Sequence, residues 1–378
     1  MSSINAVIPY VIHHPEPNDG GRMRWTCLLK ITDQAGNEGW GEAVAMWPEA
    51  CHAISTLISS GLQNIVLGRR ASEVTSLWQD LRNHSWWYGR GGLTSFAIAA
   101  IDTAIWDLWG QQINRPVHAL LGGIISAGLP SQAPLHVNQS SIEELVEFVV
   151  SLQKRGYRSA KLGFNSKGSF PLGPNPTETV RSTMELLRAA TGPKFGLMVD
   201  IGNGLNLSIE QAISFCKSLE PLNLGWIDEP LDPDDWQGYQ RLRGSTQLPI
   251  GYGERNYRVE DYECTIARGD CDVLSIDVSR AEGITGYRKV LDLAEAAGLK
   301  TGPHSWSTAI SSAASLQVAA TSSTSCFFEM KPLQSPVQQG LALPELLFDT
   351  NGNFTPSDAP GLGIRVNHAV LKNFTVTR

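Results

Sequence analysis

The segment Gly196-Leu-Met-Val-Asp200 is a short apolar run that ends in a carboxylate, and the same pattern returns along the chain. The later runs end at Asp228 or Glu229, Glu254, Asp277, His304 and Glu329, at intervals of 23 to 28 residues. This interval is too long for a hairpin and fits a strand, a loop, a helix and a second loop. Repetition of that unit predicts a parallel (β/α) barrel, in which polar residues at the carboxyl ends of the strands meet at one mouth.

The chain before and after the repeat has a different character. We expect the barrel at residues 130–342, with its first strands near 135–138 and 159–163 and crossover helices at 142–155, 176–190, 209–219, 284–297 and 309–320. Residues 1–125 combine strand-like segments with helical spacing of apolar residues, which predicts an α+β domain. The turn-rich segment 343–378 lies beyond the last barrel helix and is expected to pack back on that domain.

Composition limits the classes of function. The 378 residues are 42% hydrophobic and carry a formal net charge of −7, which provides a core but no basic surface for nucleic acid or an anionic membrane. The apolar segment 96–110 contains Asp102 and Asp107, so we expect a buried helix there and no membrane span. The first residues lack a secretion signal, and the six cysteines show no paired spacing. A cytoplasmic protein with reduced cysteines and a small-molecule ligand is expected.

Three carboxylates fall on consecutive predicted strands. Asp200, Asp228 or Glu229, and Glu254 would present oxygen ligands to one divalent cation, and the scarcity of sulfur and imidazole donors favours Mg²⁺ over Zn²⁺. Because neighbouring side chains on a strand point to opposite faces, only one of Asp228 and Glu229 can enter the barrel. The alternative is that these acids cap helices or form surface ion pairs. Three of them on consecutive strands favour the metal site.

Asp277 and His304 end neighbouring predicted strands. A carboxylate that accepts a hydrogen bond from one imidazole nitrogen fixes the tautomer and raises the pKa of the histidine. The other nitrogen is then free to remove a proton. The alternative is a loop histidine with an ordinary structural hydrogen bond. The position beside the predicted metal site favours the acid–base dyad.

A series of short motifs runs in order along nearly the whole chain: Gly39-Trp-Gly-Glu42, Gly89-Arg-Gly-Gly92, residues 100–110, Leu120-Leu-Gly-Gly123, Trp226-Ile-Asp-Glu-Pro230, Asp277 with Gly283-Ile-Thr, Gly302-Pro-His-Ser-Trp306 and Pro360-Gly-Leu-Gly363. No single motif is decisive. Their order and spacing together resemble the enolase superfamily, and within it the mandelate racemase and muconate lactonizing enzyme group with its acid-sugar dehydratases.

The resemblance implies an α/β fold, a modified (β/α)₇β barrel with an α+β capping domain, and an active site between them. It implies that Asp200, Asp228 and Glu254 bind Mg²⁺, that His304 and Asp277 form the dyad, and that the protein is a homo-oligomer. By the same resemblance, Glu329 hydrogen-bonds the substrate carboxylate or enolate, and Lys161 contacts the substrate carboxylate. The alternatives are that Glu329 pairs with Lys331 and that Lys161 belongs to a structural ion pair.

The chain departs from the family pattern at two positions. Asp228 stands where the family usually has the longer Glu, so Glu229 stays an alternative ligand. Family members often end the second barrel strand with Lys-x-Lys, but here the strand reads Lys161-Leu-Gly163, and the base that would face His304 is missing. Proton transfer between two bases, as in a racemase, is therefore disfavoured.

Elimination is the reaction that these residues favour. We expect His304 to remove the proton α to the carboxylate of a sugar acid, either aldonate or aldarate, with Mg²⁺ and Lys161 holding that carboxylate. Loss of the 3-hydroxyl then gives a 2-keto-3-deoxy acid, so the protein is expected to be a lyase. Alternatives are an epimerase, racemase or cycloisomerase of the same superfamily, and a non-catalytic member. An amidohydrolase is disfavoured because His136-Val-Asn138 lacks a second histidine.

Candidate specificity residues lie in the N-terminal domain. The loop from His13 to Arg24 contains two histidines and two arginines, of which His13, Arg22 and Arg24 are candidates for binding hydroxyls or a distal carboxylate. Trp47 is a fourth candidate, together with the aromatic run 86–88, although aromatic clusters more often belong to a core or an interface. The sequence does not identify the sugar.

Overall fold

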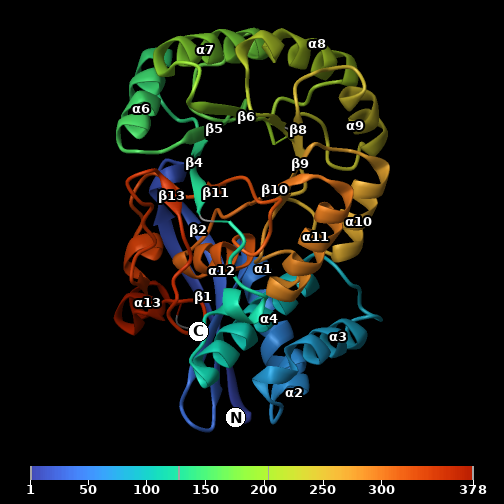
Figure 1. The fold of residues 1–378 in the computed structure, drawn as a ribbon, viewed down its shortest axis with the longest axis vertical. Helices are drawn as coiled ribbons and strands as arrows, with labels where there is room; N and C mark the ends of the chain where they lie inside the picture. The colour runs from blue at the N-terminus through green and yellow to red at the C-terminus, as the bar shows by residue number, and fades with distance from the viewer. Residues whose placement is uncertain (1, 127, 203, 377–378) are drawn as a thin grey trace.

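The computed structural model describes residues 2–126, 128–202 and 204–376 and shows a parallel barrel with a second domain beneath it (Figure 1). The eight barrel strands lie side by side in chain order from β4 to β10, and β11 pairs with β4. The barrel closes between β10 and the segment just before β11, where Thr301 and Ser325 form a β-bridge. Their bounds are β4 Leu129–His136, β5 Ser159–Gly163, β6 Gly196–Asp200, β7 Ile227–Asp228, β8 Ile250–Tyr252, β9 Val273–Ile276, β10 Lys300–Pro303 and β11 Phe328–Glu329. The predicted (β/α)₇β barrel is confirmed.

Among the described residues, seven helices connect the strands, and α6 to α11 form the outer ring in Figure 1. They are α6 Ile142–Lys154, α7 Pro176–Thr191, α8 Ile209–Leu219, α9 Trp236–Arg243, α10 Val259–Arg268, α11 Gly283–Ala297 and α12 Ala309–Ala319. The predicted start of α8 is confirmed, because Ser208 and Gln211 form a capping box. The predicted stop of α11 is also confirmed, with Gly298 in the left-handed conformation.

The first barrel strand begins earlier than the sequence suggested. It runs from Leu129 to His136, whereas we expected a strand at 135–138. Pro130 and Pro134 lie inside it, and proline is rare in central strands because it cannot donate a ladder hydrogen bond. Because of these prolines, the sequence did not predict most of the strand. Its carboxyl end nevertheless lies at the expected mouth of the barrel.

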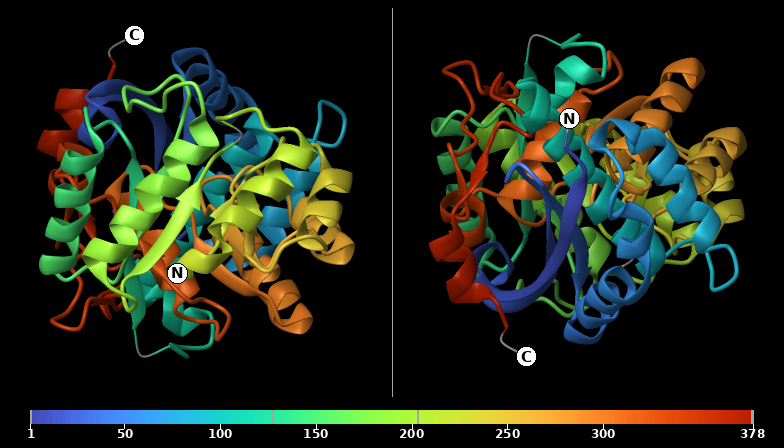
Figure 2. Two further views of the ribbon diagram at one scale, coloured as in Figure 1. Left: turned by 90° about the horizontal axis from the view of Figure 1, so that it is seen from above. Right: turned by 90° about the horizontal axis from the view of Figure 1, so that it is seen from below.

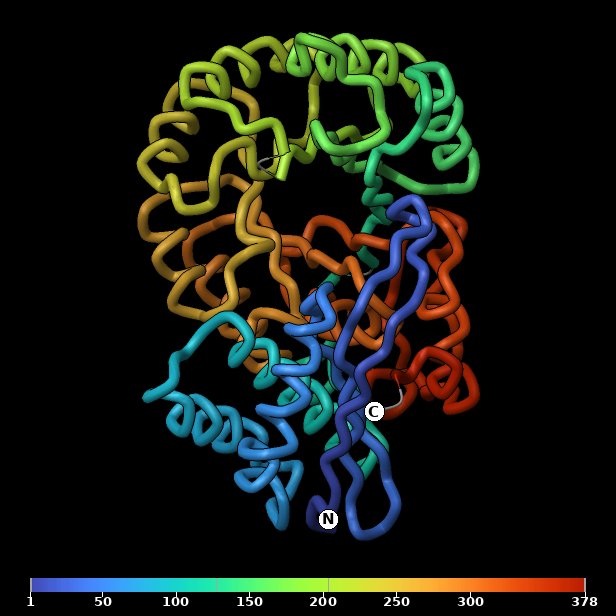
Figure 3. The backbone as a smooth tube through the Cα atoms, turned by 180° about the vertical axis from the view of Figure 1, so that it is seen from behind, coloured from blue at the N-terminus to red at the C-terminus, as the bar shows by residue number. Residues whose placement is uncertain are grey.

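The N-terminal domain is an antiparallel sheet, in the order β1-β2-β3, covered by helices. Its elements are β1 Ile4–Glu16, β2 Arg22–Asp33, β3 Glu38–Met46, α1 Pro48–Leu57, α2 Gln63–Val66, α3 Val74–His84, α4 Leu93–Ile113 and α5 Val117–Leu120. The β1–β2 hairpin is long enough to reach the mouth of the barrel (Figure 3). Residues of the hairpin tip therefore contribute to the cavity between the domains.

Buried carboxylates of this domain bind backbone and hydroxyl groups of the barrel. Glu42 on β3 accepts hydrogen bonds from the Thr308 hydroxyl (2.6 Å) and the Ser311 N–H (3.1 Å) at the start of α12. Asp102 on α4 accepts two from Thr285 on α11, at 2.6 and 2.8 Å. These contacts fix the domain that carries the hairpin against the barrel.

The C-terminal segment contacts both parts of the molecule. Its elements are β12 Ala342–Leu343, β13 Asn353–Phe354, β14 Arg365–Val366 and α13 His368–Phe374. Strand β13 pairs with β4 of the barrel. Helix α13 packs beside β1, and Figure 2 shows this red C-terminal helix next to the blue N-terminal strands. Within the described residues, no helix is both long and apolar enough to cross a membrane.

Candidate active site

A cavity of about 530 Å³ lies at the carboxyl ends of the barrel strands, where the hairpin covers them. The barrel contributes Lys161, Asp200, Glu254 and His304 to its wall, and the N-terminal domain contributes Asp19, Arg22, Arg24, Met46 and Trp47. The loop after β5 closes another side through Phe164, Asn165, Lys167 and Gly168. Most of the sequence-predicted site residues therefore meet at one mouth, between the two domains.

Asp200, Asp228 and Glu254 offer carboxylate oxygens that all lie within 4.8 Å of one another. Asp228, and not Glu229, joins this cluster because Glu229 turns away and pairs with Arg255 at 3.0 Å. The positive φ of Glu229, 42°, is the local bend that separates the two side chains. Although Asp228 is shorter than the Glu that the family usually has at this position, its carboxylate still joins the cluster.

The charge of this cluster fits a divalent cation. Burial raises the pKa of Asp200 to about 7 despite the nearby Lys161 ammonium. Asp228 Oδ1 is buried without a hydrogen-bond partner in the described part of the chain. Closely spaced carboxylates with an unsatisfied oxygen are stabilised by a cation that replaces the missing proton or donor. Oxygen donors alone are the ligands typical of Mg²⁺.

Lys161 lies in the centre of the acidic residues. Its ammonium group is 3.0 Å from Asp228, 2.9 Å from Glu329 and 3.5 Å from Asp200. Although burial lowers the pKa of Lys161, these carboxylates raise it well above its ordinary value. Lys161 is therefore a buried positive charge held between these carboxylates.

Glu329 accepts a hydrogen bond from the backbone N–H of Ser305, at 3.1 Å, in addition to its ion pair with Lys161. It does not pair with Lys331, which instead binds Glu16 on β1 at 2.5 Å. The alternative that Glu329 pairs with Lys331 is therefore wrong, because its ion pair is with Lys161.

His304 and Asp277 form the predicted pair. His304 Nδ1 lies 2.8 Å from Asp277 Oδ2, and the other oxygen of Asp277 accepts the N–H of Ser279 at 2.8 Å. His304 Nε2 faces the cluster, 3.7 Å from Glu254 Oε2. Burial lowers the pKa of His304, but the carboxylates of Glu254 and Asp277 raise it to about 9. His304 lines the cavity, where a histidine can exchange a proton with a ligand.

The specificity candidates divide into two groups. Arg22, Arg24 and Trp47 line the cavity, whereas His13 does not and packs edge-on against Trp25. The aromatic run 86–88 is exposed and is absent from the cavity wall. Sequence analysis missed Asp19 and His136, which meet at 3.1 Å in the cavity wall. They are 117 residues apart, so no local pattern links them.

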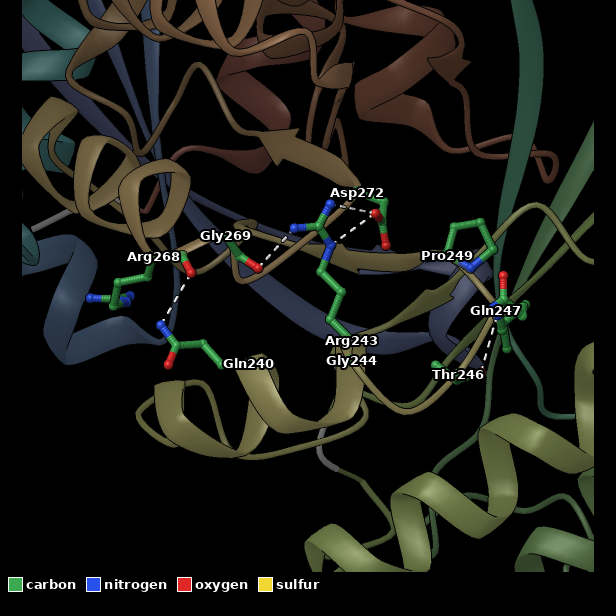
Figure 4. Close-up of a pocket in the computed structure, with 10 residues that line it drawn as sticks. Gln240, Arg243, Gly244, Thr246, Gln247, Pro249, Arg268, Gly269 and Asp272 are labelled. Carbon is green, nitrogen blue, oxygen red and sulfur yellow. Dashed lines mark hydrogen bonds and ion pairs between the residues drawn. The ribbon is translucent and has the colours of Figure 1, made fainter.

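A second hollow, of about 620 Å³, lies at the opposite end of the barrel, where strands β8 and β9 begin (Figure 4). Its charged groups bind one another: Arg243 contacts Asp272 at 2.7 Å and the Gly269 carbonyl at 3.0 Å. It contains no cluster of groups suited to catalysis. The cavity at the carboxyl ends is therefore the candidate active site.

Comparison with known families agrees with this geometry. A family model described as enolase C-terminal domain-like matches residues 144–370. The model of the mandelate racemase and muconate lactonizing enzyme N-terminal domain matches residues 23–122. The chain belongs to the enolase superfamily. Its barrel and capping domain are those of the mandelate racemase and muconate lactonizing enzyme group, as the sequence motifs predicted.

Relatives within the superfamily carry out more than one reaction. The chain is 26% identical to the D-galactarolactone cycloisomerase of Agrobacterium fabrum, over 98% of each chain. It is 27% identical to a D-mannonate dehydratase of Caulobacter, over 93% of this chain and 91% of the relative. The crystal structure of the 3,6-anhydro-D-galactonate cycloisomerase of Zobellia galactanivorans aligns over both whole chains with a TM-score of 0.85 and 28% identity. These proteins act on sugar acids or their lactones.

Proposed function

We propose that this protein is a Mg²⁺-dependent acid-sugar dehydratase, a lyase that converts an aldonate or aldarate to a 2-keto-3-deoxy acid. The observation that carries the proposal is the carboxylate-backed His304. Its Nε2 lies beside the acidic cluster, in a cavity where Gly163, at the end of β5, has no side chain. One base beside the cluster suits removal of the proton α to a carboxylate, followed by elimination.

Asp200, Asp228 and Glu254 would hold the Mg²⁺, which when bound neutralises negative charge on the substrate carboxylate and on the enolate derived from it. Lys161 binds the same carboxylate through its buried ammonium group. Glu329 keeps Lys161 in place at 2.9 Å. These residues orient the substrate so that its α-proton faces His304 Nε2.

His304 then removes the α-proton, and Asp277 holds the resulting imidazolium through the 2.8 Å contact to Nδ1. The electrons of the broken C–H bond form the enolate and then expel the 3-hydroxyl as water, after it gains a proton. The enol formed in this way takes up a proton at the third carbon and becomes the 2-keto-3-deoxy acid.

A cycloisomerase is the second candidate, because two of the relatives carry that name at similar identity. A cycloisomerase forms the same enolate but loses no water from the substrate as a whole. An epimerase or racemase needs a second base at the α-carbon, and Gly163 cannot supply one. A non-catalytic role is disfavoured because the Asp277–His304 contact and the acidic cluster are both intact.

The proposal is tested with a stereochemically complete panel of aldonic and aldaric acids, in which 2-keto acid is measured with semicarbazide. We expect one or a few acids to give product with Mg²⁺ and none to do so after treatment with EDTA. His304→Asn is the matched inactive variant, and the exposed His84→Gln variant is the control for loss of a histidine. A panel without any keto acid in the presence of Mg²⁺ would overturn the proposal.

A further inference from the structure

A second histidine stands at the barrel mouth in a position related to that of His304. The register of the parallel strands places His136, Gly163, Asp200 and Asp228 side by side at the ends of β4, β5, β6 and β7. The acidic cluster comes from β6, β7 and the loop after β8. His136 lies two strands before this group, and His304 follows β10, two strands after it. The two histidines therefore flank the predicted metal site.

His136 is held by a carboxylate in the same manner as His304. Its Nδ1 lies 3.1 Å from Asp19 Oδ1, and the other oxygen of Asp19 binds Arg24 at 2.7 Å. The His136 ring also stacks on Trp306, with ring centroids 4.3 Å apart. Burial raises the pKa of Asp19, but the hydrogen bond to His136 and the charge of Arg24 lower it to about 2. Asp19 is thus an ionised partner that fixes the ring.

The other nitrogen of His136 is available to a ligand. His136 lines the cavity with a side chain that is 46% exposed, and among the described residues Nε2 has no hydrogen-bond partner. Gly163 places no side chain between His136 and Asp200. A Cβ at Gly163 would lie 2.9 Å from the Leu135 carbonyl oxygen, so the close packing of these strands favours glycine there.

The strand spacing indicates which substrate atom His136 can reach. Two steps of the sheet separate its strand from that of Asp200, which is roughly 10 Å. A substrate whose carboxylate lies at the acidic cluster presents its α-carbon to His304. The side of the cavity near His136 is left for atoms farther along the carbon chain. The hydroxyl on the third carbon is the reacting group on that side of the α-carbon, so it is the group that His136 would approach.

We propose that His136 is the general acid of the reaction, which protonates the leaving hydroxyl, and that Asp19 is its positioning residue. The inference rests on the proposed dehydratase function. His304 takes the α-proton, the C–H electrons form the new carbon–carbon double bond, and the bond from the third carbon to oxygen breaks. The proton on His136 Nε2 joins the departing oxygen, so that water leaves and His136 becomes neutral. Solvent returns the proton to His136 before the next turnover.

The test compares two leaving groups in one variant. His136→Asn is assayed with the acid sugar that the wild-type enzyme dehydrates and with its 3-deoxy-3-fluoro analogue, because fluoride leaves without first being protonated. We expect kcat for the hydroxyl substrate to fall about 100-fold and kcat for the fluoro substrate to change less than about threefold. His304→Asn should lose both reactions, and His84→Gln should lose neither. Thermal unfolding of each variant confirms that it is folded.

The outcomes separate this inference from the function on which it rests. A His136→Asn variant that dehydrates the hydroxyl substrate at the wild-type rate overturns the role of His136 alone. Equal losses with both substrates would also overturn it, because they indicate a binding or structural role. If the wild-type enzyme dehydrates no acid sugar, the proposed function fails, and this inference fails with it.

Discussion

Asp228 and Glu229 are neighbours in the sequence, yet their surroundings differ completely. Asp228 meets Asp200 and Glu254, whereas Glu229 turns to Arg255. The alternation of side chains on a strand predicted that only one of them could enter the barrel, but the choice of Asp228 came from the family resemblance. Asp19 and His136 were not predicted, because their contact depends on how a hairpin tip meets a distant strand.

Replacement of Asp228 by Asn is expected to weaken Mg²⁺ binding. Removal of a residue that only hydrogen-bonds a metal ligand typically lowers metal affinity about 10–100-fold. Removal of a ligand's charge should therefore lower Mg²⁺ affinity at least about tenfold. The affinity is measured by calorimetric titration of the metal-free protein with Mg²⁺. Glu229→Gln is the matched control, and a larger loss in that variant than in Asp228→Asn would assign the fourth-strand ligand to Glu229.

Replacement of His304 by Asn is expected to lower kcat by about 10²–10⁴-fold, because the variant cannot accept the α-proton. Mg²⁺ affinity should change little, since His304 is not among the carboxylates of the cluster. Steady-state kinetics and the same titration measure the two quantities on one preparation. Full turnover in this variant would contradict the assignment of the base.

At the scale of elements, the strand-end pattern predicted the barrel because each parallel strand repeats the same apolar run. The short helices α9 and α10 were not among the helices predicted, and α9 is only eight residues long with a polar composition. The motif Gly39-Trp-Gly-Glu42 was matched by resemblance alone. The structure gives its physical reason: β3 crosses α4 so closely that a Cβ on Gly41 would lie 2.0 Å from the Ala100 carbonyl oxygen.

Gly41→Ala is therefore expected to destabilise the protein by about 1–3 kcal/mol or more, because backbone atoms of α4 would have to move. Urea unfolding measures the change in the free energy of unfolding. Gly61→Ala is the control, since a Cβ at that helical position meets nothing within 4 Å, and alanine there should stabilise by about 0.4–1 kcal/mol. Equal stability of the two variants would contradict the close crossing of β3 and α4.

At the scale of the molecule, the capping domain is attached to the barrel by carboxylates that are buried and hydrogen-bonded. Asp102 binds Thr285 and Glu42 binds the start of α12, whereas Asp107 accepts the N–H of Leu362 in the C-terminal segment at 2.8 Å. Sequence analysis predicted that the helix containing Asp102 and Asp107 is buried. It could not predict their partners, which lie 183 and 255 residues away.

These carboxylates make stability depend on pH. Burial raises the pKa of Asp102 to about 7 against the opposing hydrogen bonds from Thr285, so between about pH 4 and 7 the folded state binds a proton that the unfolded state releases. The stability that Asp102 contributes is fully present below its pKa in the unfolded state. It is lost as the pH rises through its pKa in the folded state. Asp102→Asn removes this titration and should make the decline less steep, by at most about 1.4 kcal/mol per pH unit.

The slope is measured by urea unfolding at several pH values between 5 and 8, with the exposed Asp292→Asn variant on α11 as the control. A decline in Asp102→Asn as steep as that of the control would show that Asp102 does not contribute a protonated form to the folded interface.

Dehydration is tested most directly by the mass and proton NMR spectrum of the product formed in D₂O from an acid sugar that the enzyme consumes with Mg²⁺. We expect a product that lacks one water relative to the substrate and carries one deuterium at the third carbon, where the enol is protonated by solvent. A product that retains every atom of water in the substrate would contradict dehydration and assign the enzyme to the cycloisomerases or epimerases.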